Sequence, residues 1–416
     1  MKPSITSTVF IAPGFKGLWF AGALANTALW LEMLAGGLFT LHVMNSGLAV
    51  ALVSAARSLP LLLTGAFVGV LSDAMNRKRI VVAGLLVTSV SPAVVCVLSL
   101  CGVLSPWHLG LAALVSGMVY ATEMPARRRM IAECAGDAAA SRAVAVDSMT
   151  NYATRCLGPI VGGIAYQQLG LSGAFAISAA CSVVAFLGML RIPYSQARCG
   201  PVRLQQSLSD LRDAVAYARS SKTLLILLSV TLATNLFGYS YGALLAPLGV
   251  QVLAVSPLMV GVLAAAEPAG SLLCGLLLAV KPPGGLPLLW LAGGATVLFI
   301  ALIAVSMIGR IHSPLLPMLA ILFVGGLGSA AYNIYQTTIV IVATPEHLRS
   351  RVMGLVTVCI GTWPLGTVIA GLLSRTLGPL TALGALGASG LVGIAITAAT
   401  MIGSTPASKT RSQHAK

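Results

Sequence analysis

The sequence predicts an all-α integral membrane protein in which twelve membrane-spanning helices form two six-helix bundles. Of its 416 residues, 57% are hydrophobic and only 8% are charged, whereas a soluble domain has roughly 25% charged residues. Apolar runs long enough to span a bilayer occur in two groups of six, separated by a polar stretch. The basic residues gather in the segments expected on one side of the membrane.

Each apolar run has the length that a membrane helix requires. A helix needs about 20 mainly apolar residues to cross a hydrocarbon core about 30 Å thick. The first run has no small-residue cleavage site and continues to full length, so we expect it to be a span and not a cleaved signal peptide. The twelve runs lie near residues 17–43, 47–72, 80–103, 107–126, 141–166, 172–192, 223–250, 257–280, 286–308, 314–342, 351–374 and 378–403.

The grouping of the runs predicts a linker and an internal repeat. We expect bundles at residues 1–192 and 223–403, a cytoplasmic linker at 193–222 and a cytoplasmic tail at 404–416. Apolar residues at helical spacing in SLSDLRDAVAYARSS predict an amphipathic helix in the linker. The segments that begin at Ser46 and Ser256 share Ser, Val, Ala, Leu and Gly positions. Such weak internal repeats are typical of transporters, whose binding sites lie between the repeated halves.

The basic residues behind the net charge of +15 are distributed according to membrane topology, so this charge does not indicate a nucleic-acid-binding surface. Of the 25 Lys and Arg residues, 21 lie in the segments that become cytoplasmic when the N-terminus is inside. The opposite loops receive only Arg310 and Arg375. The positive-inside rule therefore predicts a bacterial inner-membrane protein with both termini in the cytoplasm.

No pattern in the chain indicates catalysis or a bound metal. The eight cysteines and five histidines are scattered without metal-ligand spacing. No phosphate-binding GxxxxGK loop and no nucleophile-base arrangement is present. We therefore expect no enzyme activity, no metal and no cofactor, and we expect a monomer in the lipid bilayer.

The segment GVLSDAMNRKR after the second run contains the first family-specific motif. Gly69, Leu71, Asp73 and Arg77 match the GxLaDrxGrr loop, so the chain resembles the major facilitator superfamily. The resemblance implies that Gly69, Asp73 and Arg77 form a cytoplasmic gate, with Glu123 as a partner for Arg77. A basic topology loop is the alternative interpretation, but it explains neither Asp73 nor Gly69.

A second motif, GPIVGG, lies in the fifth run. Gly158, Pro159, Gly162 and Gly163 resemble a motif found in antiporters of this superfamily, although Gly and Pro also serve ordinary helix packing. Further segments, including TPEHLRSRVMGL, resemble the subgroup that contains the enterobactin exporter and macrolide efflux proteins. This resemblance implies export, and it leaves the cargo open between siderophores and drug-like molecules of multidrug resistance.

Five ionisable residues interrupt the apolar runs, where such groups are costly unless paired or functional. Glu32 is our first candidate for proton coupling, and a permanent pair with Arg57 or with a backbone group is the alternative. The resemblance implies that Arg155 and Glu267 pair between helices, with direct substrate binding as the alternative, and Glu267 is a second candidate proton site. Asp147 is a third, or it ends a charge network with Arg142.

Polar and aromatic residues in four runs are candidates for a cargo cavity, because an apolar cavity with a few polar groups suits an amphiphilic molecule. Each is also compatible with helix packing or interfacial anchoring. The candidates are Asn26, Trp30, Asn235, Tyr239, Tyr332, Asn333, Tyr335, Gln336 and Trp363.

Together these features predict a secondary transporter that exports a small amphiphilic molecule, with the proton gradient as its energy source. Import of a nutrient or of an iron-siderophore complex on the same fold is the alternative. A membrane receptor without transport is a third reading, but the chain has no soluble domain of its own to carry a signal.

Overall fold

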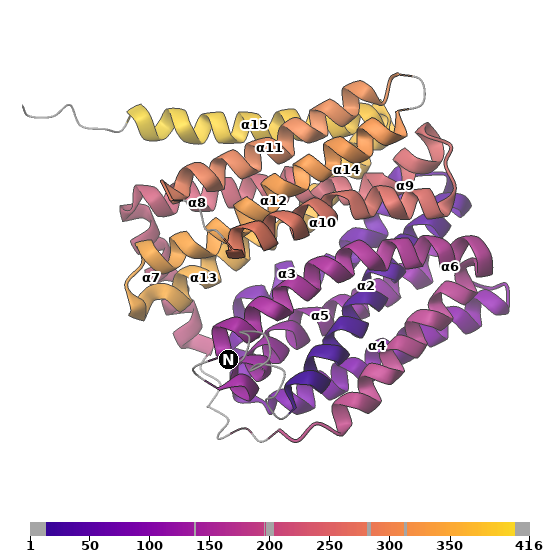
Figure 1. The fold of residues 1–416 in the computed structure, drawn as a ribbon, viewed down its shortest axis with the longest axis horizontal. Helices are drawn as coiled ribbons and strands as arrows, with labels where there is room; N and C mark the ends of the chain where they lie inside the picture. Colours follow the sequence, from indigo (N-terminus) through magenta and orange to yellow (C-terminus); the bar gives the residue numbers. More distant parts are fainter. Residues whose placement is uncertain are drawn as a thin grey trace, which may run out of the picture.

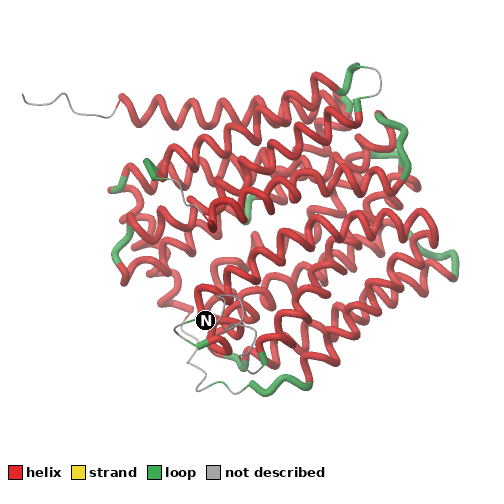
Figure 2. The backbone as a smooth tube through the Cα atoms, in the orientation of Figure 1, coloured by secondary structure: helices red, strands yellow, loops and turns green. Residues whose placement is uncertain are grey.

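In the part of the chain that the structure describes, twelve helical segments run between the two ends of the molecule, and Figure 1 shows how they are arranged. The structure, a computed structural model, describes residues 14–136, 139–194, 196, 204–280, 284–311 and 314–403. The side chains of residues 64–74, 204–211 and 401–403 lie outside this description. Within the described ranges every regular element is a helix and none is a strand (Figure 2). Helices are expected here, because a helix satisfies its own backbone hydrogen bonds in lipid.

The N-terminal group of helices, which we call the N-bundle, contains α2 to α6. Four of its helices are single rods: α2 Phe15–Met44, α3 Gly47–Ala74, α4 Arg77–Leu100 and α5 Pro106–Ala135. The fifth, α6 Ala140–Leu190, reverses direction at Gly170, which has a φ of 67°. Positive φ is accessible to glycine at little steric cost. The two legs of α6 therefore supply two spans without a loop between them.

The second group, the C-bundle, begins after α7 Leu204–Ser220. Its first span is irregular and runs from α8 Lys222–Ala233 through η1 Thr234–Gly238, η2 Tyr239–Leu244, α9 Leu245–Pro247 and η3 Leu248–Val252. Three regular spans follow, α10 Pro257–Val280, α11 Pro287–Ile308 and α12 Leu315–Ala343. The eleventh span is divided into α13 Glu346–Ile360 and α14 Trp363–Leu377, and the last is α15 Pro379–Gly403.

This count confirms the predicted fold class. Among the described residues, ten helical runs are long and apolar enough to cross a membrane, and Gly47–Leu63 of α3 is a shorter apolar helix. One of the ten is α6, whose two legs are two spans, so twelve segments result. Many outward positions on these segments are apolar, such as Leu63, Leu100 and Ile300, as expected for helices with one face in lipid.

The two bundles pack together at one end of the molecule, which we call the far end because α7 lies at the opposite, linker end (Figure 1). An apolar cluster there joins Leu34, Leu38, Leu41 and Val50 of the N-bundle to Ala246 and Val260 of the C-bundle. Gln251 Nε2 donates to Asn45 Oδ1 across the same junction at 3.1 Å. These contacts close the far end.

Candidate functional site

Glu32 lies in the interior of the N-bundle and is held from two sides. Its Oε2 is 3.0 Å from Arg57 Nη2 of α3, and its Oε1 accepts a hydrogen bond of 2.6 Å from the Ser178 hydroxyl of α6. Glu32 is only 7% exposed. The ion pair considered as an alternative from the sequence is therefore present, while a proton-coupling role for Glu32 stays a prediction.

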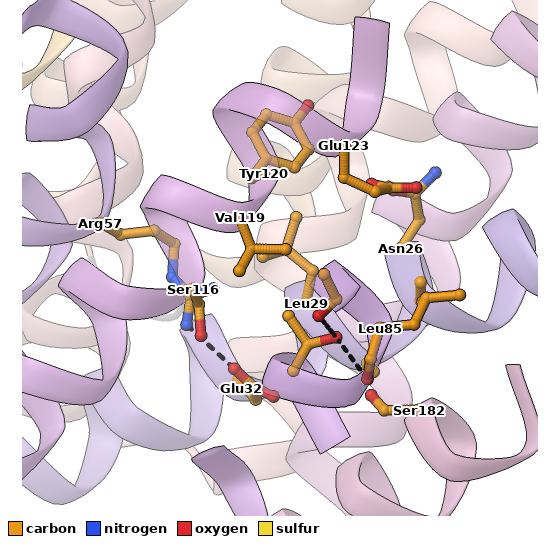
Figure 3. A pocket seen from close by; sticks show the side chains of 14 residues that line it. Asn26, Leu29, Glu32, Arg57, Leu85, Ser116, Val119, Tyr120, Glu123 and Ser182 are labelled. Atoms are coloured by element: carbon orange, nitrogen blue, oxygen red, sulfur yellow. Dashed lines mark hydrogen bonds and ion pairs between the residues drawn. The ribbon is translucent and has the colours of Figure 1, made fainter. Parts of the chain in front are cut away.

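A cavity of about 40 Å³ opens beside this pair, entirely within the N-bundle (Figure 3). Figure 3 draws Glu32 and Arg57 at one end of the cavity and Glu123 and Asn26 at the other. The lining combines three charged side chains with hydroxyl, amide and apolar groups. It consists of Ala25, Asn26, Ala28, Leu29, Glu32, Arg57, Gly84, Leu85, Thr88, Ser116, Val119, Tyr120, Glu123 and Ser182.

Glu123 belongs to a buried cluster of charges with Arg127 and Asp147. Arg127 Nε lies 3.2 Å from Glu123 Oε1, and its Nη1 lies 2.6 Å from Asp147 Oδ1. All three residues are less than 10% exposed. The guanidinium fits because Gly22 of α2 faces it, and a Cβ at Gly22 would lie 2.1 Å from Arg127 Nη1.

Two partner predictions were therefore wrong. Arg77 begins α4 at the linker end and pairs with Glu133, not with Glu123, because Glu123 lies almost three turns deeper on α5. Asp147 pairs with Arg127 and also lies 3.8 Å from Arg128 Nε, whereas Arg142 is exposed. The sequence places Arg127 in a basic loop, and only its spacing of four residues from Glu123 signals an ion pair on one helix face.

The remaining part of the expected gate lies partly outside the description. Gly69 and Asp73 lie in the stretch 64–74 whose side-chain surroundings are outside the description, so their role stays a prediction. The Arg77 and Glu133 pair has a third member, because the Tyr194 phenol donates a hydrogen bond to Glu133. Burial and this hydrogen bond raise the pKa of Tyr194 to about 12. The phenol is therefore protonated at physiological pH and keeps donating.

Arg155 and Glu267 form the ion pair expected between helices, with Nη2 and Oε2 3.2 Å apart. Arg155 is on α6 and Glu267 on α10, so the pair joins the two bundles. The Arg155 guanidinium also lies 5.1 Å from the ring centroid of Trp30, within the range of a cation–π contact. Among the described residues, Trp30 Nε1 and Arg155 Nε are buried donors with no hydrogen-bond acceptor.

The glycines of GPIVGG bring three helices into backbone contact. A Cβ at Gly158 would lie 2.6 Å from Trp30 Cβ, and a Cβ at Gly162 would lie 3.0 Å from the Leu31 carbonyl oxygen. Gly163 faces the C-bundle, where a Cβ would lie 2.5 Å from the Pro257 carbonyl oxygen. The motif thus packs α6 against α2 and against α10, and its connection with antiport stays a prediction.

The polar candidates of the C-bundle form hydrogen bonds with one another. Tyr332 Oη accepts from Gln336 Nε2 at 2.6 Å and from Asn235 Nδ2 at 3.3 Å, and all three residues are buried. Tyr239 Oη accepts from Asn333 Nδ2 at 2.6 Å, and these two residues are only partly buried. Sequence spacing did not reveal that these two groups differ in exposure.

Comparison with known proteins agrees with this architecture. The sequence profile of the family described as transmembrane secretion effector, a branch of the major facilitator superfamily, matches residues 6–415. The multidrug efflux pump Tap of Mycolicibacterium fortuitum is 27% identical over 380 residues, which are 86% of this chain and 88% of Tap. An uncharacterized transporter of the superfamily, YfiS of Bacillus subtilis strain 168, is 24% identical over 51% of each chain.

Solved structures show the same fold at low sequence identity. A point mutant of the nucleoside transporter NupG superposes with a TM-score of 0.70 at 14% identity and covers 93% of this chain and 99% of its own. The transporter PepTSo of the POT family has a TM-score of 0.75 at 12% identity, with 94% and 99% covered. From its profile match and its fold, this chain belongs to the transmembrane secretion effector family of major facilitator transporters.

Proposed function

We propose that this transporter exports a small amphiphilic molecule across the bacterial inner membrane in exchange for protons. The family is one of transporters, and the relative Tap is named as a multidrug efflux pump. The basic residues collect at the linker end, so this end faces the cytoplasm by the positive-inside rule. The closed far end would then be the end away from the cytoplasm, which is compatible with cargo entering from the cytoplasmic side.

The buried carboxylate of Glu32 is the main observation that supports proton exchange. A carboxylate inside an apolar bundle is costly to keep charged. Its charge is compensated here by Arg57 and by the Ser178 hydroxyl. A proton that binds Glu32 removes the attraction to Arg57 and frees the guanidinium, so protonation is linked to how α2 and α3 pack.

The groups between the bundles support an amphiphilic cargo. Trp30 and Arg155 offer an aromatic face and two buried N–H donors that lack acceptors among the described residues. Unpaired buried donors are costly, and a ligand acceptor would satisfy them. Tyr239 and Asn333 on the C-bundle add a phenol and an amide. A molecule with an aromatic or apolar body and oxygen acceptors, such as a siderophore or a macrolide, matches this chemistry.

The test is transport into liposomes that contain the purified protein, with a macrolide and a siderophore as probes. A pH gradient should drive probe movement in the wild type, and Glu32→Gln should reduce this rate by about 100-fold. Exchange of probe without a gradient should continue in Glu32→Gln. Glu346→Gln, which removes an exposed carboxyl at the start of α13, is the matched control and should behave as wild type.

Direction is tested separately in cells that carry or lack the gene. Export predicts lower probe accumulation in cells that carry the gene, and this difference should disappear when the proton gradient is collapsed. Higher accumulation would instead indicate import. Gradient-driven transport that is unchanged in Glu32→Gln would refute Glu32 as the coupling site.

A further inference from the structure

The cavity inside the N-bundle lies apart from the groups between the bundles to which the proposed function assigns the cargo, although the cargo candidate Asn26 lines it. It is lined from all five helices α2 to α6 and reaches from the Glu32 and Arg57 pair to Glu123. Ser116 and Glu123, both on α5, line it at levels seven residues apart, which is about 10 Å along a helix. This length exceeds that of a hydrogen bond, so the carboxylates of Glu32 and Glu123 at the two ends of the cavity are not in direct contact.

Buried polar atoms at both ends of this cavity lack hydrogen bonds. Among the described residues, Arg57 Nη1 and Glu123 Oε1 are buried and have no hydrogen-bond partner, although Glu123 Oε1 lies near Arg127 Nε. Buried polar groups in native proteins are nearly always satisfied, by protein or by water. A cavity of about 40 Å³ with charged and hydroxyl groups in its lining has room for about three water molecules, so ordered water is expected there. Hydroxyls of Thr88, Ser116 and Ser182 line the space between.

The charges favour water over a metal cation as the occupant. Glu32 faces the guanidinium of Arg57 from α3, and Glu123 faces that of Arg127 on its own helix. A sodium ion bound to either carboxylate would lie beside a positive charge. A proton differs, because it neutralises the carboxylate without needing a coordination shell.

A second cavity lies on the other side of the Glu32 and Arg57 pair. Besides that pair, its one polar side chain is the hydroxyl of Ser54, and its other lining residues, such as Val53, Leu109 and Phe175, are apolar or glycine. Few groups there can hold a chain of water. The first cavity therefore offers Glu32 more groups that can hold water, on the side that leads to Glu123.

We propose that a chain of water molecules in this cavity carries protons between Glu32 and Glu123, so that Glu123 is a second protonation site of the transport cycle. This proposal rests on the proposed function, because it assigns the route of the exchanged proton. In each transfer the carboxylic O–H bond at one end breaks and an O–H bond forms at the other carboxylate. The intervening waters pass on one proton each and end unchanged in composition.

The titratable groups around the route belong to few helices. Arg57 from α3 and Tyr120 from α5 lie beside the cavity with Glu32, while Arg127 of α5 and Asp147 of α6 surround Glu123. The lining residues of α4 and α6 carry no ionisable group. The proton route lies inside one bundle and the cargo path between the two, so the two solutes do not share a binding surface.

The experiment measures proton uptake without cargo, in purified wild type and variants in detergent. After a rapid drop in pH, the infrared band of protonated carboxyls is followed in time, and the part absent in Glu32→Gln is assigned to Glu32. Ser116→Leu fills the cavity between the two acids and should slow this part by about tenfold. Thr122→Leu is the matched control on α5, because the Thr122 hydroxyl donates only to carbonyls of its own helix.

Each outcome decides the proposal. Slow protonation of Glu32 in both Ser116→Leu and Glu123→Gln, with Thr122→Leu as fast as wild type, supports it. A wild-type rate in Ser116→Leu overturns the water route, and a wild-type rate in Glu123→Gln overturns Glu123 as the second site. Ser116→Val is a smaller filler to use if leucine prevents folding. The infrared measurement uses no cargo. A failure of gradient-driven transport in liposomes would therefore overturn the proposed function, but it would not change the result for proton uptake by Glu32.

Discussion

Arg155 of α6 and Glu267 of α10 join the two bundles through an ion pair of 3.2 Å. Glu267 is 1% exposed, and its other oxygen accepts a hydrogen bond from the Ser271 hydroxyl at 3.0 Å. Toward the far end the same two helices meet at Pro159 and Gly261. Opening of the far end must separate these helices, so the ion pair contributes to the closed state that the structure shows.

Removal of one charge from this pair should destabilise the protein. Glu267→Gln leaves Arg155, whose side chain is 20% exposed, without a counter-ion, which costs up to about 3 kcal/mol for a largely buried pair. The double variant with Arg155→Gln as well should recover a large part of this loss, because no lone charge remains. Thermal unfolding in detergent measures both. A double variant less stable than either single one would contradict the pairing energetics.

Gly22→Ala should disrupt the cluster of Glu123, Arg127 and Asp147. The new Cβ would lie 2.1 Å from Arg127 Nη1, so the guanidinium must move away from Asp147. Overpacking of this kind costs about 1–3 kcal/mol. Gly36→Ala on the same helix is the control, since no atom lies within 4 Å of its Cβ position. Equal unfolding temperatures for the two variants would refute the close fit around Arg127.

Gly261→Ala should weaken the closed far end. Its Cβ would lie 2.4 Å from the carbonyl oxygen of Pro159 on the other bundle, a backbone atom that cannot rotate away. A shift of about 1.4 kcal/mol changes the ratio of closed to open molecules tenfold. Gly275→Ala on the same helix has no atom within 4 Å of its Cβ position and serves as the control.

The distance between the two bundles at the far end reports this shift. Spin labels at the exposed positions Met44 and Val250, after replacement of the exposed Cys101, allow that distance to be measured by electron resonance. We expect a longer-distance population in Gly261→Ala and a distribution like the wild type in Gly275→Ala. Identical distributions in both variants would show that the contact at Gly261 does not hold the far end closed.

Tyr332→Phe should affect stability more than cargo selection. Its hydroxyl accepts from Asn235 and Gln336, and its removal leaves two buried amides without that partner, at a cost of about 1–3 kcal/mol. Tyr166→Phe, at a partly exposed tyrosine, should unfold near the wild-type temperature. If Tyr332→Phe instead kept full stability and lost affinity for one probe, Tyr332 would be a direct cargo contact.

Hydropathy was sufficient to predict the fold, because the bilayer imposes a length and an apolar composition on every span. The intramembrane charges were equally visible in the sequence, since Arg155 and Glu267 are rare residue types in apolar runs. Their pairing followed from the expected arrangement of spans in the family. The structure then supplied the distance between them and the contact with Trp30.

The cluster around Arg127 could not be predicted in the same way. The run of three arginines at 127–129 is typical of a cytoplasmic loop, yet α5 continues to Ala135 and turns Arg127 inward. Hydropathy does not show how far a helix extends beyond the lipid, nor which face of its last turns is covered. The space for the guanidinium depends on Gly22, which is distant in sequence, so no local pattern reveals it.

The buried charges are divided unequally between the two halves of the chain. Among the described residues, Glu32, Glu123, Arg127 and Asp147 are buried in the N-bundle, whereas the one buried charged residue of the C-bundle is Glu267 at the interface. The C-bundle has neutral amides and phenols at its polar positions instead. Under the proposed function, the two halves are separate targets for substitution. Changes among the neutral groups of the C-bundle would alter which compounds are carried and would leave the proposed proton site in the N-bundle unchanged.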